Sequence, residues 1–394
     1  MTSWKGLSDV TRYPLAVVAP SLGTPSETFI QRHMIDLLPG RTALAVREVV
    51  APKLAGDAPL LEIGRSRGKL RWAFDGTGYA VGLSSLSPVQ RSLGRFLERN
   101  GVEVVLSEYL DQSLKWLPVA RHYGIRFFAH AHGYDVSKSL RDPDIRVSYL
   151  RLAEADGIIT MSRYSRDRLV EIGLPANKIH VVPYGIDVPR VLPERATGPH
   201  VRCLAVGRMV PKKAPLSTLE AFRLAAQEFP GLRLDYVGDG PLFEQAAEFV
   251  RGHGLEQRVT LHGVQPNATV LRLMKESGIF LQHSVTAPVT GDQEGLPVAI
   301  LEAMAYGLPV VSTRHAGIPE SVVEGETGLL NDEGDVPTMA ANLLLLARDP
   351  ELRERMGRDG WQRVRDQFSW EHERNALLEL MGLSSGHAGG LERL

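Results

Sequence analysis

Short apolar runs recur along the whole chain, and stretches with helical character separate them. Most of these runs are rich in Val, Ile and Leu without polar alternation, which is typical of strands covered on both faces. Strands that alternate with helices form parallel, doubly wound sheets. The runs that predict strands are residues 15–20, 43–50, 102–107, 126–131, 157–161 and 179–183, then 201–206, 232–237, 259–262, 278–282, 308–312 and 327–330.

A proline-rich segment divides this pattern into two halves. Residues 188–199 (VPRVLPERATGP) contain three prolines and favour an extended linker. We therefore predict an α/β protein with two Rossmann-like, doubly wound domains, residues 1–190 and residues 199–365. The amphipathic stretch within residues 366–382 is predicted to be a helix that packs back onto the first domain, and the Gly- and Ser-rich tail 384–394 to fray.

Two such domains create a cleft between them, because ligands of doubly wound sheets sit beyond the carboxyl ends of the strands. This geometry suits a two-part substrate. We expect the second half to bind a donor and the first half to bind an acceptor.

Composition excludes several classes of protein. The 394 residues include 45 Lys+Arg and 46 Asp+Glu, a net charge of −1, so nucleic acid is not an expected partner. The single Cys203 excludes a disulfide framework and a four-cysteine zinc site. We find neither a signal peptide nor a membrane-spanning run, and expect a cytoplasmic location. The basic segment 64–71, followed by Trp72 and Phe74, is either a peripheral contact with the inner membrane face or an exposed loop.

The segment 294–307 (EGLPVAILEAMAYG) carries the most chemical information. Pro297 suits the first position of a helix and Gly307 suits the position just past its end. Backbone amides would therefore gather at Leu296, Pro297 and Val298, where they can bind phosphate. Glu294 could then hold a hexose and Glu302 a ribose. The alternative is a surface helix with two solvated glutamates.

Cationic side chains follow the first strand of the second half. Arg208 ends that strand, and Lys212 and Lys213 follow a short turn, so they could clamp a diphosphate. His262-Gly263 ends the third strand and could lie near a nucleobase. Each signal is weak alone, since lysines in loops are usually solvated.

The first half offers two further candidate sites. The polar loop 20–28 (PSLGTPSET) contains Gly23, which permits close ligand approach. Glu27 and Thr28 could contact an acceptor sugar, while Ser26 could simply cap a helix over residues 28–38.

His130, His132 and Asp135 follow a buried strand of the first half. Because the two histidines are two positions apart, they point to one face. A metal site needs more ligands than these residues supply, so no metal is predicted. The alternative is a pair of hydrogen-bonded core histidines. We interpret residues 142–144 (DPD) as a surface turn and not as a metal-binding pair of aspartates.

The order of these motifs resembles a known family. GR…KK, VGDGP, HG, EGLPVAILEAMAYGLPVVST, GIPE and GETGLL look like the carboxyl half of the GT-B glycosyltransferases of family GT4, and Glu294 and Glu302 fit its E-x7-E motif. The segment SETFI (residues 26–30) resembles the corresponding segment of the subgroup that builds exopolysaccharides and O-antigens. The chain departs from the family at Ala214 and Ala316, where glycine is common.

The resemblance implies a retaining hexosyltransferase that uses a UDP- or GDP-sugar without cofactor or metal. It implies that Arg208 and Lys213 bind the diphosphate, leaving open whether Lys212 takes that role. It also implies that the His132 side chain contacts the donor sugar, and that Gly263 and Asp135 lie on the donor and acceptor sides. The acceptor would be a saccharide, a lipid-linked sugar or a small molecule, in polysaccharide or glycolipid biosynthesis.

Three alternatives remain open at this point. The chain could decorate a natural product, it could be an epimerase or phosphorylase of activated sugars on the same fold, or it could bind sugar nucleotides without catalysis. The presence of Arg208, Lys213, Glu294 and Glu302 together argues against the last of these.

Overall fold

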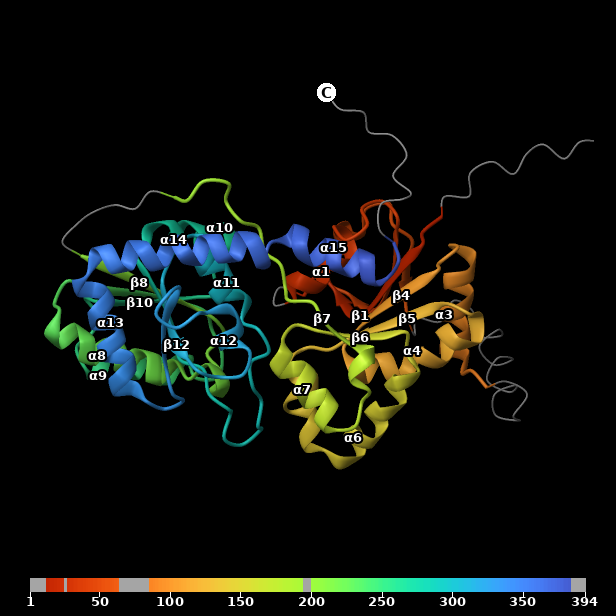
Figure 1. Cartoon of the computed structure of the whole chain (residues 1–394), viewed down its shortest axis with the longest axis horizontal. Coiled ribbons are helices and arrows are strands. Elements are labelled where there is room, and N and C mark those ends of the chain that lie inside the picture. Colours follow the sequence, from red (N-terminus) through yellow and green to blue (C-terminus); the bar gives the residue numbers. More distant parts are fainter. Residues whose placement is uncertain (1–11, 25–26, 64–84, 194–199, 384–394) are drawn as a thin grey trace, which may run out of the picture.

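The computed structural model describes residues 12–24, 27–63, 85–193 and 200–383. These residues form two lobes, each built on a parallel sheet covered by helices on both faces (Figure 1). The predicted architecture, two doubly wound parallel-sheet domains, is therefore confirmed. Ser26, the basic segment 64–71 with Trp72 and Phe74, and the tail 384–394 lie outside the described residues.

The first domain contains a seven-stranded sheet in the order β3-β2-β1-β4-β5-β6-β7. Every neighbouring pair is parallel, so each connection crosses a face of the sheet. Its strands are β1 (Leu15–Leu22), β2 (Thr42–Val49), β3 (Leu60–Glu62), β4 (Val104–Glu108), β5 (Arg126–His130), β6 (Gly157–Thr160) and β7 (Ile179–Val181). Its α-helices are α1 (Thr28–Ile35), α3 (Pro88–Arg99), α4 (Leu110–Tyr123), α5 (Gly133–Val136), α6 (Pro143–Tyr149) and α7 (Arg163–Glu171), with 3-10 turns η1 (Pro52–Ala55), η2 (Ser139–Arg141), η3 (Leu150–Glu154) and η4 (Ala176–Lys178).

The second domain contains a six-stranded parallel sheet in the order β10-β9-β8-β11-β12-β13. Its strands are β8 (Val201–Val206), β9 (Leu232–Val237), β10 (Val259–Gly263), β11 (Ile279–Gln282), β12 (Val310–Thr313) and β13 (Gly328–Asn331). Its helices are η5 (Pro211–Lys213), α8 (Pro215–Glu228), α9 (Phe243–Gly252), α10 (Asn267–Glu276), α11 (Val298–Ala305), α12 (Ile318–Ser321), α13 (Val336–Arg348) and α14 (Pro350–Gln367).

Alternate residues of each strand feed different cores. In β1, Ala16 and Val18 pack into one apolar cluster, whereas Leu15 and Val17 pack into another on the opposite face. The second sheet also separates two clusters. Both faces of every central strand are therefore dry, which explains why these strands appear as uninterrupted apolar runs in the sequence.

The strand orders place one topological switch point in each sheet. In the first sheet the switch point lies between the neighbouring strands β1 and β4, because successive strands are added in one direction from β1 and in the other from β4. In the second sheet it lies between β8 and β11 for the same reason. The loops that follow these strands diverge at the switch point and leave a crevice, which is where ligands of this fold class bind.

The last helix returns to the first domain. α14 runs along the second domain, and α15 (Trp370–Leu380) lies beside α1 in the other lobe (Figure 1). Leu377, Leu378 and Met381 pack into the core cluster that contains Leu15 and Val17. Ile186 also pairs with Ser369, so two segments link the lobes at this point.

Two local predictions needed correction. The strand β3 was not predicted, because it is only three half-buried residues long at the sheet edge. Residues 142–144 do not form a simple turn: Asp142 caps α6 by accepting from the amides of Asp144 and Ile145. Among the described residues, no helix combines the length and apolar character needed to cross a bilayer.

The packing of α15 yields a stability prediction. Leu377 is fully buried against the first domain, so Leu377→Ala removes core contacts and leaves a cavity, lowering the free energy of unfolding by about 2–5 kcal/mol. Leu345→Ala is the matched control, because that side chain is 48% exposed and its loss should change stability by about 0.5 kcal/mol or less. Urea denaturation followed by tryptophan fluorescence measures both; equal shifts for the two variants would contradict this packing.

Candidate functional site

The switch point of the second domain gathers positive charge. Gly207 and Arg208 follow β8, and Lys212 and Lys213 form the η5 turn before α8. Arg208 is exposed, and its charge helps to lower the pKa of Lys213. The Lys213 side chain lies against Gly207: a β-carbon there would stand 3.6 Å from Cε of Lys213. Arg208 and Lys213 are therefore neighbours at one edge of the sheet.

Glu294 pairs with this lysine cluster. Its carboxylate lies 3.2 Å from Nζ of Lys213 and 3.7 Å from Nζ of Lys212. Lys212 also contacts the Asp292 carboxylate at 3.2 Å and donates to the Gln293 carbonyl. Lys212 is thus occupied by three consecutive residues, 292–294, of the loop before α11, whereas Lys213 has Glu294 as its partner.

Burial changes the ionisation of this pair in opposite ways. Burial alone would raise the pKa of Glu294, but the charges of Lys213 and Lys212 outweigh it and hold that pKa below its usual value. Burial lowers the pKa of Lys213, while Glu294 opposes the shift. Glu294 is therefore ionised, and one of its oxygens, Oε1, is buried without a hydrogen-bond partner. An unused acceptor of this kind costs about 1–3 kcal/mol or more, which a donor from a bound molecule would recover.

A buried histidine holds the backbone of Glu294. The amide of Glu294 donates to Nε2 of His315 at 3.1 Å, so that nitrogen is an acceptor. Nδ1 of His315 consequently donates to the carboxylate of Glu333 at 2.5 Å, and Glu333 also accepts from the amide of Thr286. No sequence pattern indicates this series of hydrogen bonds, because its members are far apart in the sequence and belong to no motif.

The start of α11 lies next to Glu294. Pro297 occupies the N-cap, one position earlier than expected, and Gly307 adopts φ 72° just past the helix end. Among the described residues, the amides of Leu296 and Val298 have no hydrogen-bond acceptor. Pro297 has no amide hydrogen, so the phosphate-binding capacity of this turn rests on its neighbours.

Glu302 lies one turn further along α11 and faces the first domain. Burial raises the pKa of Glu302 to about 7, against an opposing effect of the Arg32 guanidinium on α1. Arg32 itself is bound by Asp187 and stacks on Trp370.

Gly263 ends β10 with φ 63° and accepts from the amide of Gly238; its neighbour His262 is bound to Asp235.

The first-domain switch point is built from polar side chains. Glu27 accepts from the hydroxyl groups of Tyr109 at 2.9 Å and Ser21 at 3.2 Å, and Thr28 is exposed at the start of α1. Tyr109 follows β4 with φ 66° and ψ 135°, a strained backbone for a non-glycine residue. Gly23 serves packing: a β-carbon there would stand 2.5 Å from that of Ala51.

His132 and Asp135 face inward. His132 is 3% exposed. Both nitrogens of its ring are hydrogen-bonded, Nε2 to Glu108 at 2.8 Å and Nδ1 to the Tyr184 hydroxyl at 2.7 Å. Burial lowers the pKa of His132 to about 4, so the ring is neutral. Asp135 is fully buried and accepts from the His132 amide and the Tyr149 hydroxyl. Neither side chain offers a free group to the cleft.

The two domains touch through glycine backbones at this site. A β-carbon on Gly133 of the first domain would stand 3.1 Å from the amide nitrogen of Gly295 in the second. Within the second domain, one on Gly317 would stand 2.0 Å from the carbonyl oxygen of Gly295. Ala316, beside this contact, adopts φ 47°, and Ala214, before α8, adopts φ 37°. Both alanines thus occupy the left-handed backbone region, which glycine adopts at the least cost. This explains why glycine would suit both positions.

Glu320 spans the domains as a helix cap. Its carboxylate accepts from the amides of Arg163 and Tyr164 at 2.8 Å each, at the start of α7. The Tyr164 hydroxyl donates a hydrogen bond to the side chain of Gln293, the residue before Glu294. This second-domain glutamate therefore holds the first domain against the loop that carries Glu294.

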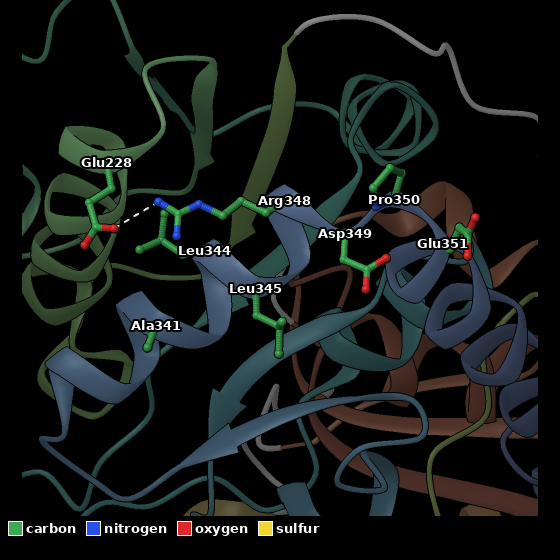
Figure 2. A pocket seen from close by; sticks show the side chains of 8 residues that line it. All are labelled: Glu228, Ala341, Leu344, Leu345, Arg348, Asp349, Pro350 and Glu351. Carbon is green, nitrogen blue, oxygen red and sulfur yellow. Dashed lines mark hydrogen bonds and ion pairs between the residues drawn. The ribbon is translucent and has the colours of Figure 1, made fainter.

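The second domain also carries a hollow that lies away from these residues. Helices α8, α13 and α14 form it, and the ion pair between Arg348 and Glu228 closes one side (Figure 2). None of the predicted site residues lines it.

Comparison with known proteins agrees with this architecture. Residues 198–363 match the family described as "Glycosyl transferases group 1", and residues 32–190 match "Glycosyltransferase Family 4". The amylovoran biosynthesis glycosyltransferase AmsK of Erwinia amylovora is 36% identical over 55% of this chain and 54% of its own length. The putative colanic acid biosynthesis glycosyltransferase WcaL of Salmonella typhimurium is 31% identical over 64% of this chain and 62% of its own length. The matches thus span about half to two thirds of these relatives.

Among solved structures, the Anabaena protein HepE in complex with UDP superposes with a TM-score of 0.75 at 16% identity, covering 93% of this chain and 99% of HepE. Two doubly wound domains whose switch points face each other define the GT-B class of fold. The chain belongs to the glycosyltransferases that join a family 4 domain to a group 1 domain, related to exopolysaccharide enzymes.

The raised pKa of Glu302 predicts a pH-dependent stability. Between its ordinary value of 4.5 and about 7, the unfolded chain releases the proton that the folded chain keeps, so rising pH destabilises the fold. Glu302→Gln removes this penalty and should stabilise the protein by about 1–2 kcal/mol at pH 8, but not at pH 4. Denaturation at both pH values measures it, with exposed Glu256→Gln as the control. A stability gain that is the same at both pH values would argue against a raised pKa.

Proposed function

We propose that this chain is a retaining glycosyltransferase that moves a hexose from a nucleoside diphosphate sugar to an acceptor hydroxyl. The observation that carries the proposal is the buried Lys213–Glu294 pair at the second switch point. Its Oε1 oxygen accepts no hydrogen bond and has only Nζ of Lys212 near it, at 3.7 Å, so it suits a sugar hydroxyl, and the adjacent cations suit a diphosphate. A pure ion pair of the scaffold would not need an unused acceptor or the exposed Arg208 beside it.

In this proposal the donor lies along the second switch point. Arg208, Lys213 and the amides at Leu296 and Val298 hold the diphosphate, with Pro297 fixing the turn. Glu294 accepts hydrogen bonds from the hexose. Glu302 accepts from the ribose, and the backbone at Gly263 lies beside the base.

The same cations supply the chemistry. When the bond between the sugar and the diphosphate breaks, negative charge grows on the leaving phosphate. Arg208, Lys213 and the start of α11 are already in place around it, and preorganised charge is usually the largest contribution to rate. They fill the role that a divalent metal ion plays in other transferases, so the proposed transfer is metal-independent. Retention follows if the acceptor attacks the face from which the diphosphate departs.

The first domain takes the acceptor in this scheme. Glu27, Tyr109 and exposed Thr28 present polar groups at its switch point, which suit sugar hydroxyls. His132 acts as a positioning residue: its ring is anchored to Glu108 and Tyr184, and it fixes the turn at Gly133 that meets Gly295. The relationship to AmsK supports a saccharide or lipid-linked acceptor in polysaccharide or glycolipid biosynthesis.

Charge removal at the donor site should abolish function while preserving the fold. Lys213→Ala and Glu294→Gln should each lower transfer by a factor of about 100 or more, since each removes a group that faces the donor. Lys275→Ala, an exposed lysine on α10, is the control and should keep full activity. Circular dichroism checks folding. Wild-type turnover in both site variants would remove the site assignment.

The donor itself can be identified by ligand-linked stabilisation. UDP, GDP, ADP and their hexose derivatives are screened by thermal shift, and one nucleoside diphosphate series should raise the melting temperature, because ligands that bind only the folded state stabilise it. UDP is the first probe, given the UDP complex of HepE. The gain should vanish in Lys213→Ala and persist in Lys275→Ala.

The preferred donor is then incubated with and without candidate saccharide acceptors, and products are read by mass spectrometry and NMR. Transfer with the anomeric configuration of the donor supports the proposal. Conversion of donor alone would indicate an epimerase, a requirement for free phosphate would indicate a phosphorylase, and an inverted product would overturn retention.

A further inference from the structure

A cluster of buried ligand-type side chains lies in the first domain, outside the cleft. His33 comes from α1, Glu108 ends β4 and His130 ends β5. One ligand atom from each lies within 4.8 Å of the other two, and all three residues are fully buried. No metal was expected near His130 from the sequence, because His33 and Glu108 are distant in the sequence and only the fold brings them together.

The donor set matches one class of ion. Two imidazole nitrogens and one carboxylate form a set that zinc uses in proteins, with bonds of about 2.0–2.2 Å. Nδ1 of His33 lies 2.8 Å from Oε1 of Glu108, and Nδ1 of His130 lies 3.1 Å from Oε2. The three ligand atoms are therefore already grouped closely enough to surround one ion. Cys203, the chain's one thiol, lies in the other domain, so the site is built from nitrogen and oxygen alone.

The outer contacts also fit a metal site. Nε2 of His33 lies 3.1 Å from a Glu373 oxygen, and the other oxygen of Glu373 accepts from the amide of Gly185. Histidines that bind metal typically donate their second nitrogen to a carboxylate in this way. Glu108 also accepts from Nε2 of His132.

His130 supplies the second observation. It is fully buried, and neither of its ring nitrogens has a hydrogen-bond partner of acceptable geometry in the part of the chain that the structure describes. Leaving such a group unsatisfied costs about 1–3 kcal/mol. Nδ1 of His130 and Oε2 of Glu108 face each other at 3.1 Å without an aligned hydrogen bond, and a cation between them would give both atoms a partner.

We propose that His33, Glu108 and His130 bind one divalent transition-metal ion of the zinc type. The ion replaces the proton that His33 shares with Glu108: the metal ion binds the deprotonated nitrogen, and one proton leaves to solvent. Two carboxylates, Glu108 and Glu373, then balance the charge of the ion. The site joins α1, β4 and β5 beneath His132 and is structural, so it stands or falls independently of the proposed transferase activity.

The test measures metal directly. The full chain is purified without chelators, incubated with zinc chloride and separated from free metal by gel filtration, and first-row metals are quantified by mass spectrometry. We expect one zinc per chain in the wild type and in His122→Ala, whose exposed histidine is the control. His130→Asn should lose most of the zinc, and Glu373→Gln should bind about 10–100-fold more weakly.

Folding and ligand identity are checked separately. Circular dichroism and gel filtration establish that His130→Asn is folded; if it is not, zinc-edge X-ray absorption of the wild type must show scattering from two imidazoles. A wild-type chain that retains no zinc overturns the proposal and leaves a proton-bonded network of His33, Glu108 and Glu373. Undiminished zinc in folded His130→Asn, or a spectrum without two imidazoles, places the ion elsewhere and also overturns it.

Discussion

The contact between bare backbones at Gly133, Gly295 and Gly317 constrains the rest of the structure. Gly133 of the first domain lies so close to Gly295 of the second that a β-carbon on it would stand 3.1 Å from the Gly295 amide nitrogen, and Gly317 packs against Gly295 from within the second domain. The loop that carries Glu294 is therefore pressed against the turn that carries His132. The Glu320 cap and the Tyr164–Gln293 hydrogen bond add side-chain contacts between the same two domains.

Around this contact the protein separates its charges by depth. The cationic groups lie at the rim, where Arg208 is exposed and Lys213 is largely covered, while Glu294 is held beneath them by His315. On the other side, a neutral His132 sits on an ionised Glu108 whose pKa remains well below its usual value, since His130 and His33 outweigh the burial that would raise it. Polar networks thus fix the groups that line the cleft from behind, which is how a site keeps its shape before a substrate arrives.

Much of the fold was predictable from sequence, because strands buried on both faces leave continuous apolar runs and proline marks the linker. Short-range motifs also indicated the residues at the second switch point. What sequence could not supply was pairing across distance. Glu108 reaches three histidines only through strand order, Glu320 caps a helix of the other domain, and Lys212 and Lys213 differ only in which acceptor each meets. The inward orientation of His132 and Asp135 depends on Tyr184 and Tyr149, whose positions no local pattern reveals.

The return of α15 has a consequence for how the molecule is made. Glu373 and Leu377 complete the core of a domain whose other parts lie before residue 190. During synthesis, that first domain waits with an open apolar face until the ribosome has finished the second domain and the closing helix has emerged. The order of translation and the order of folding are therefore uncoupled in this chain: the lobe that is made first is the last to be sealed.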